Sequence, residues 1–347
     1  MTALDGQVAR GQGTRGQVAR EGRAIGEAAL AWVSAHRGEF ALGDDALAEH
    51  GDVNRTWKPL GELAQVCVSV RQHTEPADPL HEIASDLLAF AWRQTGQGGL
   101  FLELQRLEPF ATYPLEIYAA FASAGLRHTG FERATATVAR TRSWQVTEQL
   151  PNRRLGVLNS ERRGGLAQHD EVPRALRRTW LGGLPEPWTF ERDAGYTVTH
   201  VIFHLTNWGL TPQAVPPQVT HYLRHWLPAW LDTCLDDGRW DLSCELLAVA
   251  GSLPDPPDHA MLRDAWTALA RAQDASGAVP EVGSGREGHP PADDFTGCYH
   301  STLMAVFAAA LTADRPRPSA GAGTVAGKVS AHEHVARPGH GGQGVSR

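Results

Sequence analysis

The stretch "DLSCELLAVAGSL", residues 241–253, is apolar around nearly its whole circumference when it is wound as a helix. The same is true of "HSTLMAVFAAAL", residues 300–311. A helix that is apolar on every side must be surrounded by other elements. Both stretches carry their polar residues at the N-terminal end. We therefore predict two buried helices whose N-terminal ends collect polar side chains at the mouth of a cavity.

Further stretches place apolar residues at spacings of three and four, as amphipathic helices do. Start and stop signals agree with this period, since Asp78 with Pro79 opens one stretch and Gly125 and Gly209 end others. No convincing alternating strand pattern is present, so the sequence predicts an all-α protein. The additional predicted helices cover residues 25–36, 60–73, 80–94, 114–126, 131–144, 171–184, 196–209, 217–235 and 259–273.

A weak internal sequence repeat indicates how these helices are arranged. Both "QTGQGGLFLEL" (94–104) and "QDASGAVPEV" (273–282) follow a helix with Gln, then Gly, then an apolar residue. Recurring turns of this kind are typical of stacked helical hairpins, which form a solenoid or close into an α/α toroid. We expect a single α/α toroid over residues 23–313, with disordered segments at 1–22 and 314–347.

Composition excludes several classes of function. The 347 residues carry a net charge of -7 and a pI near 6.1, which argues against nucleic-acid binding. No run is long and apolar enough for a membrane span, and the N-terminus lacks a signal peptide, so we expect a cytoplasmic protein. The four cysteines are too scattered for a disulfide framework.

Two clusters of candidate site residues lie on predicted helices. His200 and His204 are four residues apart and share a helix face, a spacing that can hold a metal or place one histidine in the core. Asp241 and Glu245 also share a face, with Cys244 beside them. Asp241 fits a first-turn carboxylate and Cys244 a small buried residue, but a buried Glu245 needs a partner.

The other two clusters lie at a helix entrance and in a predicted loop. Cys298 and His300, in "CYH", stand directly before the last apolar run, where we expect the floor of a cavity. The stretch "PNRRLGVLNSERRGG" (151–165) is predicted to be a loop, either solvent-facing or a clamp for a diphosphate. Its paired arginines are Arg153, Arg154, Arg162 and Arg163.

Carboxylate and imidazole groups that converge in one cavity permit two kinds of chemistry. They can bind a divalent metal, for which zinc is the first candidate, with His200, Asp241 and His300 as ligands and Cys244, His204 and Cys298 as weaker ones. They can also act as general base and acid without a metal. The spacing leaves both alternatives open.

One resemblance points to zinc enzymes. "DLSC" followed by "YHSTLMAVFAA" resembles the ligands of prenyltransferase β-subunits, which are an Asp, a Cys two residues later and a distant His next to an aromatic residue. Lanthionine synthetases use a Cys and a Cys-His pair, and both families are α/α toroids. This chain departs from them, because Asp241 and Cys244 are three apart and "CYH" has an extra residue. The Asp-x-Asp-Asp motif of class II terpene cyclases is absent.

A second resemblance covers about residues 60–312. "YTVTHVIFHLTNWG", "DLSCELL", "QDASGAVP" and "YHSTLMAVFA" resemble a family of actinobacterial proteins of unassigned function that occur beside natural-product biosynthetic genes. The resemblance implies a tailoring or cyclising enzyme. It carries over to His200, Asp241, Glu245, Tyr299 and His300, and it departs at His204 and Asn207, where the family pattern has Tyr and Asp.

We therefore expect a natural-product biosynthetic enzyme that catalyses a non-redox cyclisation, isomerisation or elimination on a hydrophobic polyketide-, terpenoid- or peptide-like substrate. The alternative is a non-catalytic helical-repeat protein that binds or carries a hydrophobic metabolite or a partner. The expected catalytic residues are His200, Asp241, Glu245 and His300, and the expected substrate-binding residues are Tyr196, Asn207, Tyr299, Arg153 and Arg154.

Overall fold

The computed structural model describes residues 3–48, 52–255, 258–283 and 294–313. These residues are helical, with no β-strand in the described ranges beyond an isolated bridge between Arg239 and Val282, which confirms the all-α prediction. The helices are α1 (Ala3–Ala35), α2 (Trp57–His73), α3 (Pro79–Gln94), α4 (Gly99–Leu107), α5 (Tyr113–Ser123), α6 (Thr129–Val138), α7 (Arg142–Val146), α8 (Pro151–Gly164), α9 (Val172–Leu176), α10 (Arg192–Leu205), α11 (Pro217–Asp236), α12 (Trp240–Ser252), α13 (His259–Ala272) and α14 (Tyr299–Thr312).

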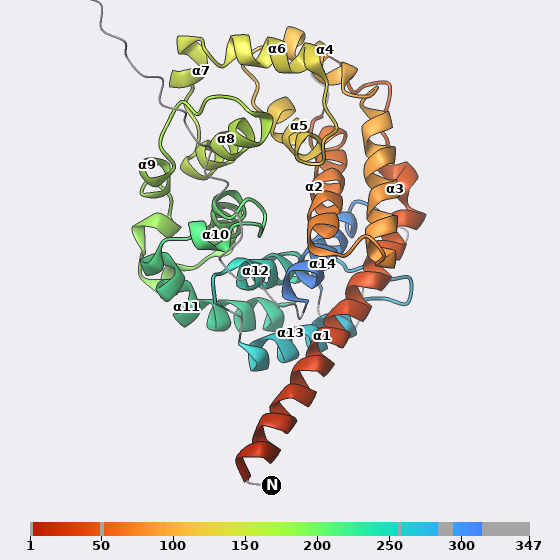
Figure 1. Ribbon diagram of the computed structural model, residues 1–347, viewed down its shortest axis with the longest axis vertical. Coiled ribbons are helices and arrows are strands. Elements are labelled where there is room, and N and C mark those ends of the chain that lie inside the picture. Colours follow the sequence, from red (N-terminus) through yellow and green to blue (C-terminus); the bar gives the residue numbers. More distant parts are fainter. Residues whose placement is uncertain (1–2, 49–51, 256–257, 284–293, 314–347) are drawn as a thin grey trace, which may run out of the picture. The chain divides into compact units, whose positions relative to one another are not determined.

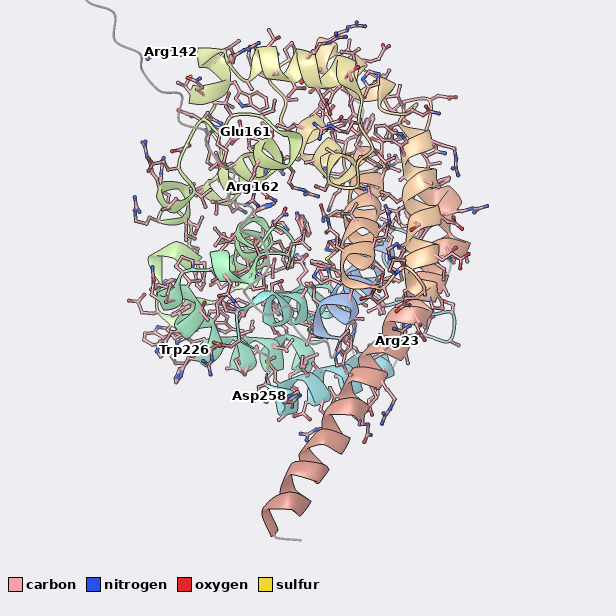
Figure 2. The ribbon with its side chains drawn as sticks, in the orientation of Figure 1. Arg23, Arg142, Glu161, Arg162, Trp226 and Asp258 are labelled. Carbon is pink, nitrogen blue, oxygen red and sulfur yellow. The ribbon has the colours of Figure 1, made fainter. Side chains whose placement is uncertain are left out.

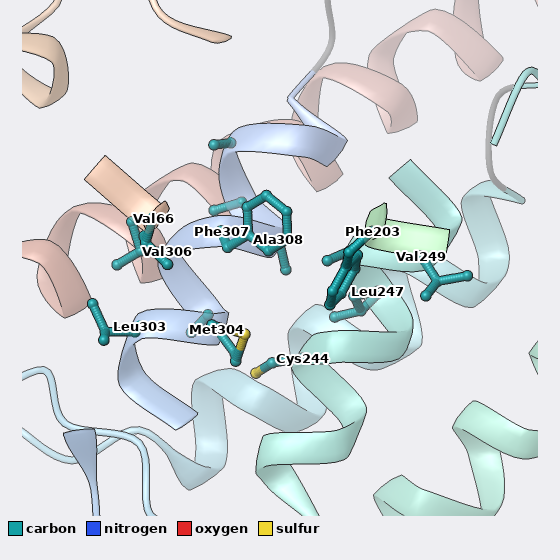
Figure 3. Packing of buried hydrophobic residues seen from close by; sticks show 14 of the residues in the cluster. Val66, Phe203, Cys244, Leu247, Val249, Leu303, Met304, Val306, Phe307 and Ala308 are labelled. Carbon is teal, nitrogen blue, oxygen red and sulfur yellow. The ribbon is translucent and has the colours of Figure 1, made fainter. Parts of the chain in front are cut away.

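The two apolar stretches form the centre of the core. Every residue of α12 is buried, including Asp241 and Glu245, and most of α14 is buried as well. Helix α12 packs against α10, α11, α13 and α14, whereas α14 packs against α1, α2 and α12. Figure 3 shows Cys244 of α12 and Met304 of α14 among the buried side chains that these helices share.

Six helices contact one another in a closed succession. Helix α2 packs on α5, α5 on α8, α8 on α10, α10 on α12, α12 on α14, and α14 on α2 again (Figure 1). Helices that lie between them in the sequence contact members of this succession: α3 packs on α2, α9 on α8, α11 on α12, and α13 on α12. In the part of the chain that the structure describes, no helix has the length and hydrophobicity needed to cross a membrane.

Helix ends follow the expected local chemistry. Asp78 caps α3 by accepting the backbone N–H of Leu80 at 3.0 Å, and its carboxylate also binds Arg23 of α1 in a bidentate ion pair. Asp258 caps α13 through the N–H groups of Ala260 and Met261. Figure 2 labels Arg23 and Asp258 on these helices. Both acids are therefore accounted for by capping, which stabilises a helix by about 1 kcal/mol.

The segment 1–22, which we expected to be disordered, lies within the described residues from Ala3 onward, where it belongs to α1. Val18 is buried. Gly22 lies so close to Trp266 that a Cβ at this position would be 2.8 Å from the indole. Ala, Arg, Gln and Glu are good helix formers, and α1 packs against α13. The expected tail at 314–347 lies outside the described residues.

Three predicted element boundaries are also wrong. Residues 151–165 form α8 and not a loop, because Pro151 occupies the first helical turn and Leu155 and Leu158 are buried. The stretch 131–144 is divided into α6 and α7, since Thr141 starts a new helix by accepting the N–H of Trp144. The stretch 171–184 contains only the short α9 and a 3-10 turn at Leu181–Gly183.

Candidate functional site

A histidine held between two glutamates is the centre of the candidate site. His300, in the first turn of α14, has its Nδ1 3.1 Å from Oε2 of Glu62 on α2 and its Nε2 3.2 Å from Oε1 of Glu245 on α12. Glu62 exposes 22 % of its side chain and His300 14 %, whereas Glu245 exposes only 2 %. We call these three side chains the carboxylate–imidazole row.

Charge and burial fix the protonation states in this row. Burial lowers the pKa of His300, but Glu62 and Glu245 outweigh it and hold that pKa well above the ordinary range. Burial raises the pKa of Glu245, but the bond from His300 and the neighbouring His200 and Thr199 bring that pKa below its usual value. At neutral pH His300 is therefore an imidazolium, which donates through both ring nitrogens.

A second pair lies beside the row at the start of α10 and α12. The hydroxyl of Tyr196 donates a hydrogen bond to Oδ2 of Asp241, and the hydroxyl of Thr199 donates to Oε2 of Glu245. The guanidinium of Arg192 lies 5.6 Å above the ring of Tyr196. Burial and the Asp241 carboxylate raise the pKa of Tyr196, so its hydroxyl keeps its proton.

His200 and His204 differ in their surroundings. Their ring centroids are 6.2 Å apart along α10, and His200 acts electrostatically on Glu245. Burial, then His200, Arg153 and Arg163, lower the pKa of His204 to about 3. Its Nδ1 is buried without a hydrogen-bond partner among the described residues. His204 is therefore neutral.

The arginines predicted to form a clamp bind different groups of the protein. Arg153 pairs with Glu116 of α5 at 2.8 Å. Arg154 contacts His169 and the main-chain oxygen of Thr147. Both Nη groups of Arg154 are therefore in contact with other groups of the protein.

A buried carboxylate on α8, Glu161, belongs to the same region. Its Oε1 accepts bonds from the indole of Trp144 at 2.8 Å and from Nδ1 of His169 at 2.6 Å. Figure 2 labels Glu161 and Arg162 on this helix. These bonds hold α7 and the segment after α8 against α8.

The remaining predicted site residues are placed in the core or in a turn. Tyr299 is buried against Phe295 and Phe40, with ring centroids 5.0 and 6.0 Å away. Asn207 adopts a left-handed backbone, φ +51°, in the turn after α10, and its Oδ1 is buried without a partner among the described residues. The ring of Tyr299 also lies edge-on to His300 of the row, with centroids 6.3 Å apart.

Both candidate cysteines are buried. Burial raises the pKa of Cys298 to about 11 and holds that of Cys244 well above its ordinary value.

Over the described ranges, no group of three or more His, Cys, Asp or Glu side chains is arranged to hold a metal ion. The expected ligands His200, Asp241 and His300 are therefore not gathered into one metal site, because Asp241 binds Tyr196 and His300 binds two glutamates.

Sequence reasoning missed Glu62, the most exposed member of the row. The signal was present, because "LGELAQVCV" sets this glutamate in an apolar helical stretch, as "CELLAVAG" sets Glu245. The Nζ of Lys58, one turn earlier, lies 3.9 Å from Oε1 of Glu62.

Glu281 was missed as well. Burial raises its pKa, and His300, Asp241, Lys58 and Glu62 all act on it.

Each of the six helices in the closed succession contributes a polar side chain from its first two turns. These are Lys58 and Glu62 of α2, Glu116 of α5, Arg153 of α8, Tyr196 of α10, Asp241 and Glu245 of α12, and His300 of α14. The unpaired N–H groups at helix N-termini favour nearby carboxylates by about 0.3–1 kcal/mol each. This placement explains how several acids are tolerated close together.

Comparison with known families gives one match. A family model described as "Domain of unknown function (DUF6895)" matches residues 26–310, so the chain belongs to this family. No curated protein and no solved structure matches the chain. The family description assigns no activity to its members.

Proposed function

We propose that this DUF6895 chain is an enzyme that catalyses a non-redox proton-transfer step, such as an isomerisation, cyclisation or elimination, at the carboxylate–imidazole row. The observation that carries the proposal is the position of His300 between Glu62 and Glu245. The side chains of His300 and Glu62 are partly exposed. A base and an acid then stand side by side at a place that a substrate can reach.

We further propose that the closed succession of helices forms an α/α toroid with the row on its inner side. The succession α2, α5, α8, α10, α12 and α14 supports this arrangement, as do the outer contacts of α3, α9, α11 and α13. The polar side chains in the first turns of all six helices would then face one end of the interior.

The proposed step uses two proton transfers that balance. The carboxylate of Glu62 removes a proton from the substrate, while the His300 imidazolium gives its Nδ1 proton to a second substrate atom. Glu62 is then protonated and His300 neutral. The 3.1 Å between Glu62 Oε2 and His300 Nδ1 lets the proton return, which restores both groups for the next turnover.

Glu245 and Thr199 act as positioning residues in this mechanism. Glu245 is almost fully enclosed, and its two oxygens accept bonds from His300 and Thr199. It therefore holds the imidazolium in place and stabilises its charge. In this proposal Glu245, which the sequence placed among the catalytic residues, acts by positioning His300. No step is assigned to a metal, because the described residues form no metal-binding group.

The context of the reaction is the specialised metabolism that the sequence resemblance implies, with a hydrophobic substrate. We test this by deleting the gene in its native host and comparing extracted metabolites. A lost product and an accumulated precursor identify the substrate. Complementation with wild type restores the product, whereas E62Q and H300Q do not.

Matched controls separate catalysis from folding and from binding. E82Q and H221Q make the same chemical changes at exposed positions on α3 and α11 and are expected to restore the product. Circular dichroism checks that E62Q and H300Q are folded. If folded E62Q and H300Q restore the product as wild type does, the chain is a binding protein and the catalytic proposal fails.

A further inference from the structure

One face of α8 is polar along its whole length. Arg153, Gly156, Asn159 and Arg163 recur at spacings of three and four, so they lie along one side of the helix. Contacts confirm which neighbours this side faces. Arg153 binds Glu116 of α5, Gly156 lies against His204 of α10, and Arg163 binds Ser123 of α5.

Among the four arginines of α8, only Arg153 pairs with a carboxylate in the described part of the chain, and Arg163 is a part-buried arginine without one. Arg153 pairs with a carboxylate, Arg154 contacts His169, and Arg162 donates to Oδ1 of Asn159 at 2.7 Å from an exposed position. The Nε of Arg163 donates to the hydroxyl of Ser123 at 2.7 Å. Within the described ranges, its two Nη groups have no protein acceptor, and no carboxylate lies within ion-pair distance.

The environment makes this cation costly. Burial, then the charge of Arg162, lower the pKa of Arg163 to about 9, so the guanidinium is still protonated at neutral pH. The guanidinium is partly buried, and its two Nη groups are not among the fully buried unpartnered atoms of the described residues, so a ligand can reach them. A poorly solvated charge without a counter-charge favours an anionic partner.

A second donor without a partner stands next to Arg163. Asn159 lies one turn earlier, is 4 % exposed, and has its Oδ1 engaged by Arg162. Its Nδ2 is buried and makes no hydrogen bond with any described residue. Glu161, between them in sequence, points to a different side of the helix, because its carboxylate binds Trp144 and His169.

We infer that Arg163 and Asn159 form a binding site for an oxyanion, a carboxylate or phosphate group of the ligand. The two Nη groups of a guanidinium match the two oxygens of such a group, and the amide of Asn159 supplies an additional donor. The imidazole of the neutral His204 lies against α8 on the same side, with its Nε2 facing Gly156. The site is separate from the carboxylate–imidazole row, and its test needs no turnover.

The test uses acetate, inorganic phosphate and pyrophosphate as probes. Each is titrated into the full-length protein by calorimetry, with chloride used to hold the ionic strength constant. We expect wild type to bind at least one probe with one-site stoichiometry. R163Q is expected to lose about tenfold or more in affinity, which corresponds to one charged hydrogen-bond partner. Preference for acetate or for the phosphates tells which anion the site takes.

Two further variants make the result decisive. N159D places a carboxylate four residues before Arg163, where it neutralises the guanidinium, and is expected to abolish probe binding. R178Q removes an exposed arginine outside α8, and is expected to bind as wild type does. Equal binding by wild type, R163Q and N159D overturns the inference, and so does the absence of binding of any probe to wild type. Should R163Q not fold, N159D carries the test.

Discussion

Glu245 illustrates how a charged residue is kept in the core of this protein. Its side chain is 2 % exposed, yet its oxygens accept bonds from His300 and Thr199, and His200 acts on it electrostatically. An unpaired carboxylate at this position would cost several kcal/mol. The pair with His300 ties α12 to α14, and Glu62 extends the tie to α2, so the site also contributes to stability.

The protonation of this pair predicts a pH dependence of stability. The raised pKa of His300 contributes stability that is complete below its ordinary value of 6.5 and is lost as pH rises through the raised, folded-state pKa. The lowered pKa of Glu245 contributes stability that is complete above its ordinary value of 4.5 and is lost as pH falls through the folded-state pKa. Both contributions are therefore complete between pH 4.5 and 6.5.

We expect the free energy of unfolding of wild type to decline above this window, and the decline to be absent in H300Q. Urea unfolding between about pH 5 and about pH 9 measures it. H221Q, an exposed histidine variant, should keep the wild-type profile. A wild-type decline that persists unchanged in H300Q would show that other groups cause it.

Gly156 provides a residue-scale test of the contact between α8 and α10. A Cβ at this position would be 2.9 Å from Nε2 of His204 and 3.4 Å from Oε2 of Glu116. G156A is therefore expected to destabilise the protein by about 1–3 kcal/mol, although alanine favours the helix. Thermal or urea unfolding measures the change.

Gly164 of the same helix is the matched control. A Cβ there would meet Leu115 at an ordinary 3.5 Å, so G164A should be neutral or stabilising by up to about 1 kcal/mol. If G156A proves as stable as G164A, then His204 moves aside without cost. The contact between Gly156 and His204 would then not be the tight packing described here.

At this scale the sequence identified part of the site. Glu245 was recognisable because a carboxylate in an apolar helix needs a partner. The same argument applied to Glu62 and was missed, since Glu62 lies in a stretch with no histidine or second acid nearby in sequence. Nothing local distinguishes Arg163 from Arg162. Only the positions of the surrounding helices separate an enclosed arginine from an exposed one.

At the scale of elements, one turn occurs twice with the same hydrogen bonds. Residues 96–98 have φ of +58°, +53° and +90°, and residues 207–209 have φ of +51°, +59° and +85°. In each turn a buried threonine, Thr95 or Thr206, accepts the backbone N–H of the glycine that ends the turn at 3.0 Å. Each turn ends a helix, α3 or α10, that packs on a neighbour in the core.

Replacing these threonines should therefore lower the free energy of unfolding more than the size of the side chain indicates. T206V keeps the shape of the side chain but leaves the N–H of Gly209 without a partner, which costs about 1–3 kcal/mol. T95V should cost less, because the N–H of Gly98 also donates to the main-chain oxygen of Thr95 at 3.1 Å. Urea unfolding measures each loss. T137V, at an exposed threonine on α6, is expected to change stability by less than about 0.5 kcal/mol. Losses no larger than that of T137V would contradict the role assigned to the turns.

Element boundaries show where local patterns fail. The sequence paired the turn at 94–100 with residues 273–282, whereas the structure repeats it at 206–211, because "TGQG" and "TNWG" share their threonine and final glycine. Helix α8 was predicted to be a loop because of its polar residues. Those residues are satisfied by α5, α10 and the segment after α8, contacts that its own sequence does not contain.

For the molecule as a whole, α14 completes the succession of helices that began with α2. It packs on α12 and on α2, and its Phe307 meets Phe203 and Trp208 from α10 and the turn after it at centroid distances of 5.2 and 5.7 Å. Figure 3 shows Phe307 and Phe203 in this core. Contacts between the two ends of the chain therefore stabilise the fold.

Weakening the contacts of α14 with its neighbours should lower the free energy of unfolding. F307A removes a fully buried aromatic ring and is expected to reduce the free energy of unfolding by about 3–5 kcal/mol. L107A, which changes a leucine that is 61 % exposed, should change it by less than about 0.5 kcal/mol. Similar unfolding midpoints for the two variants would show that α14 is not needed to hold the helices together.

The sequence by itself determined the helical class, most helix positions and the depth of α12 and α14, because apolar periodicity and capping residues act within a few residues of the chain. The tertiary structure alone decided which polar groups meet. Glu62 and His300 are 238 residues apart, and polar side chains of α8 find their partners on α5 and in the segment after α8. Side-chain partners depend on how distant helices pack, and no local pattern encodes that packing.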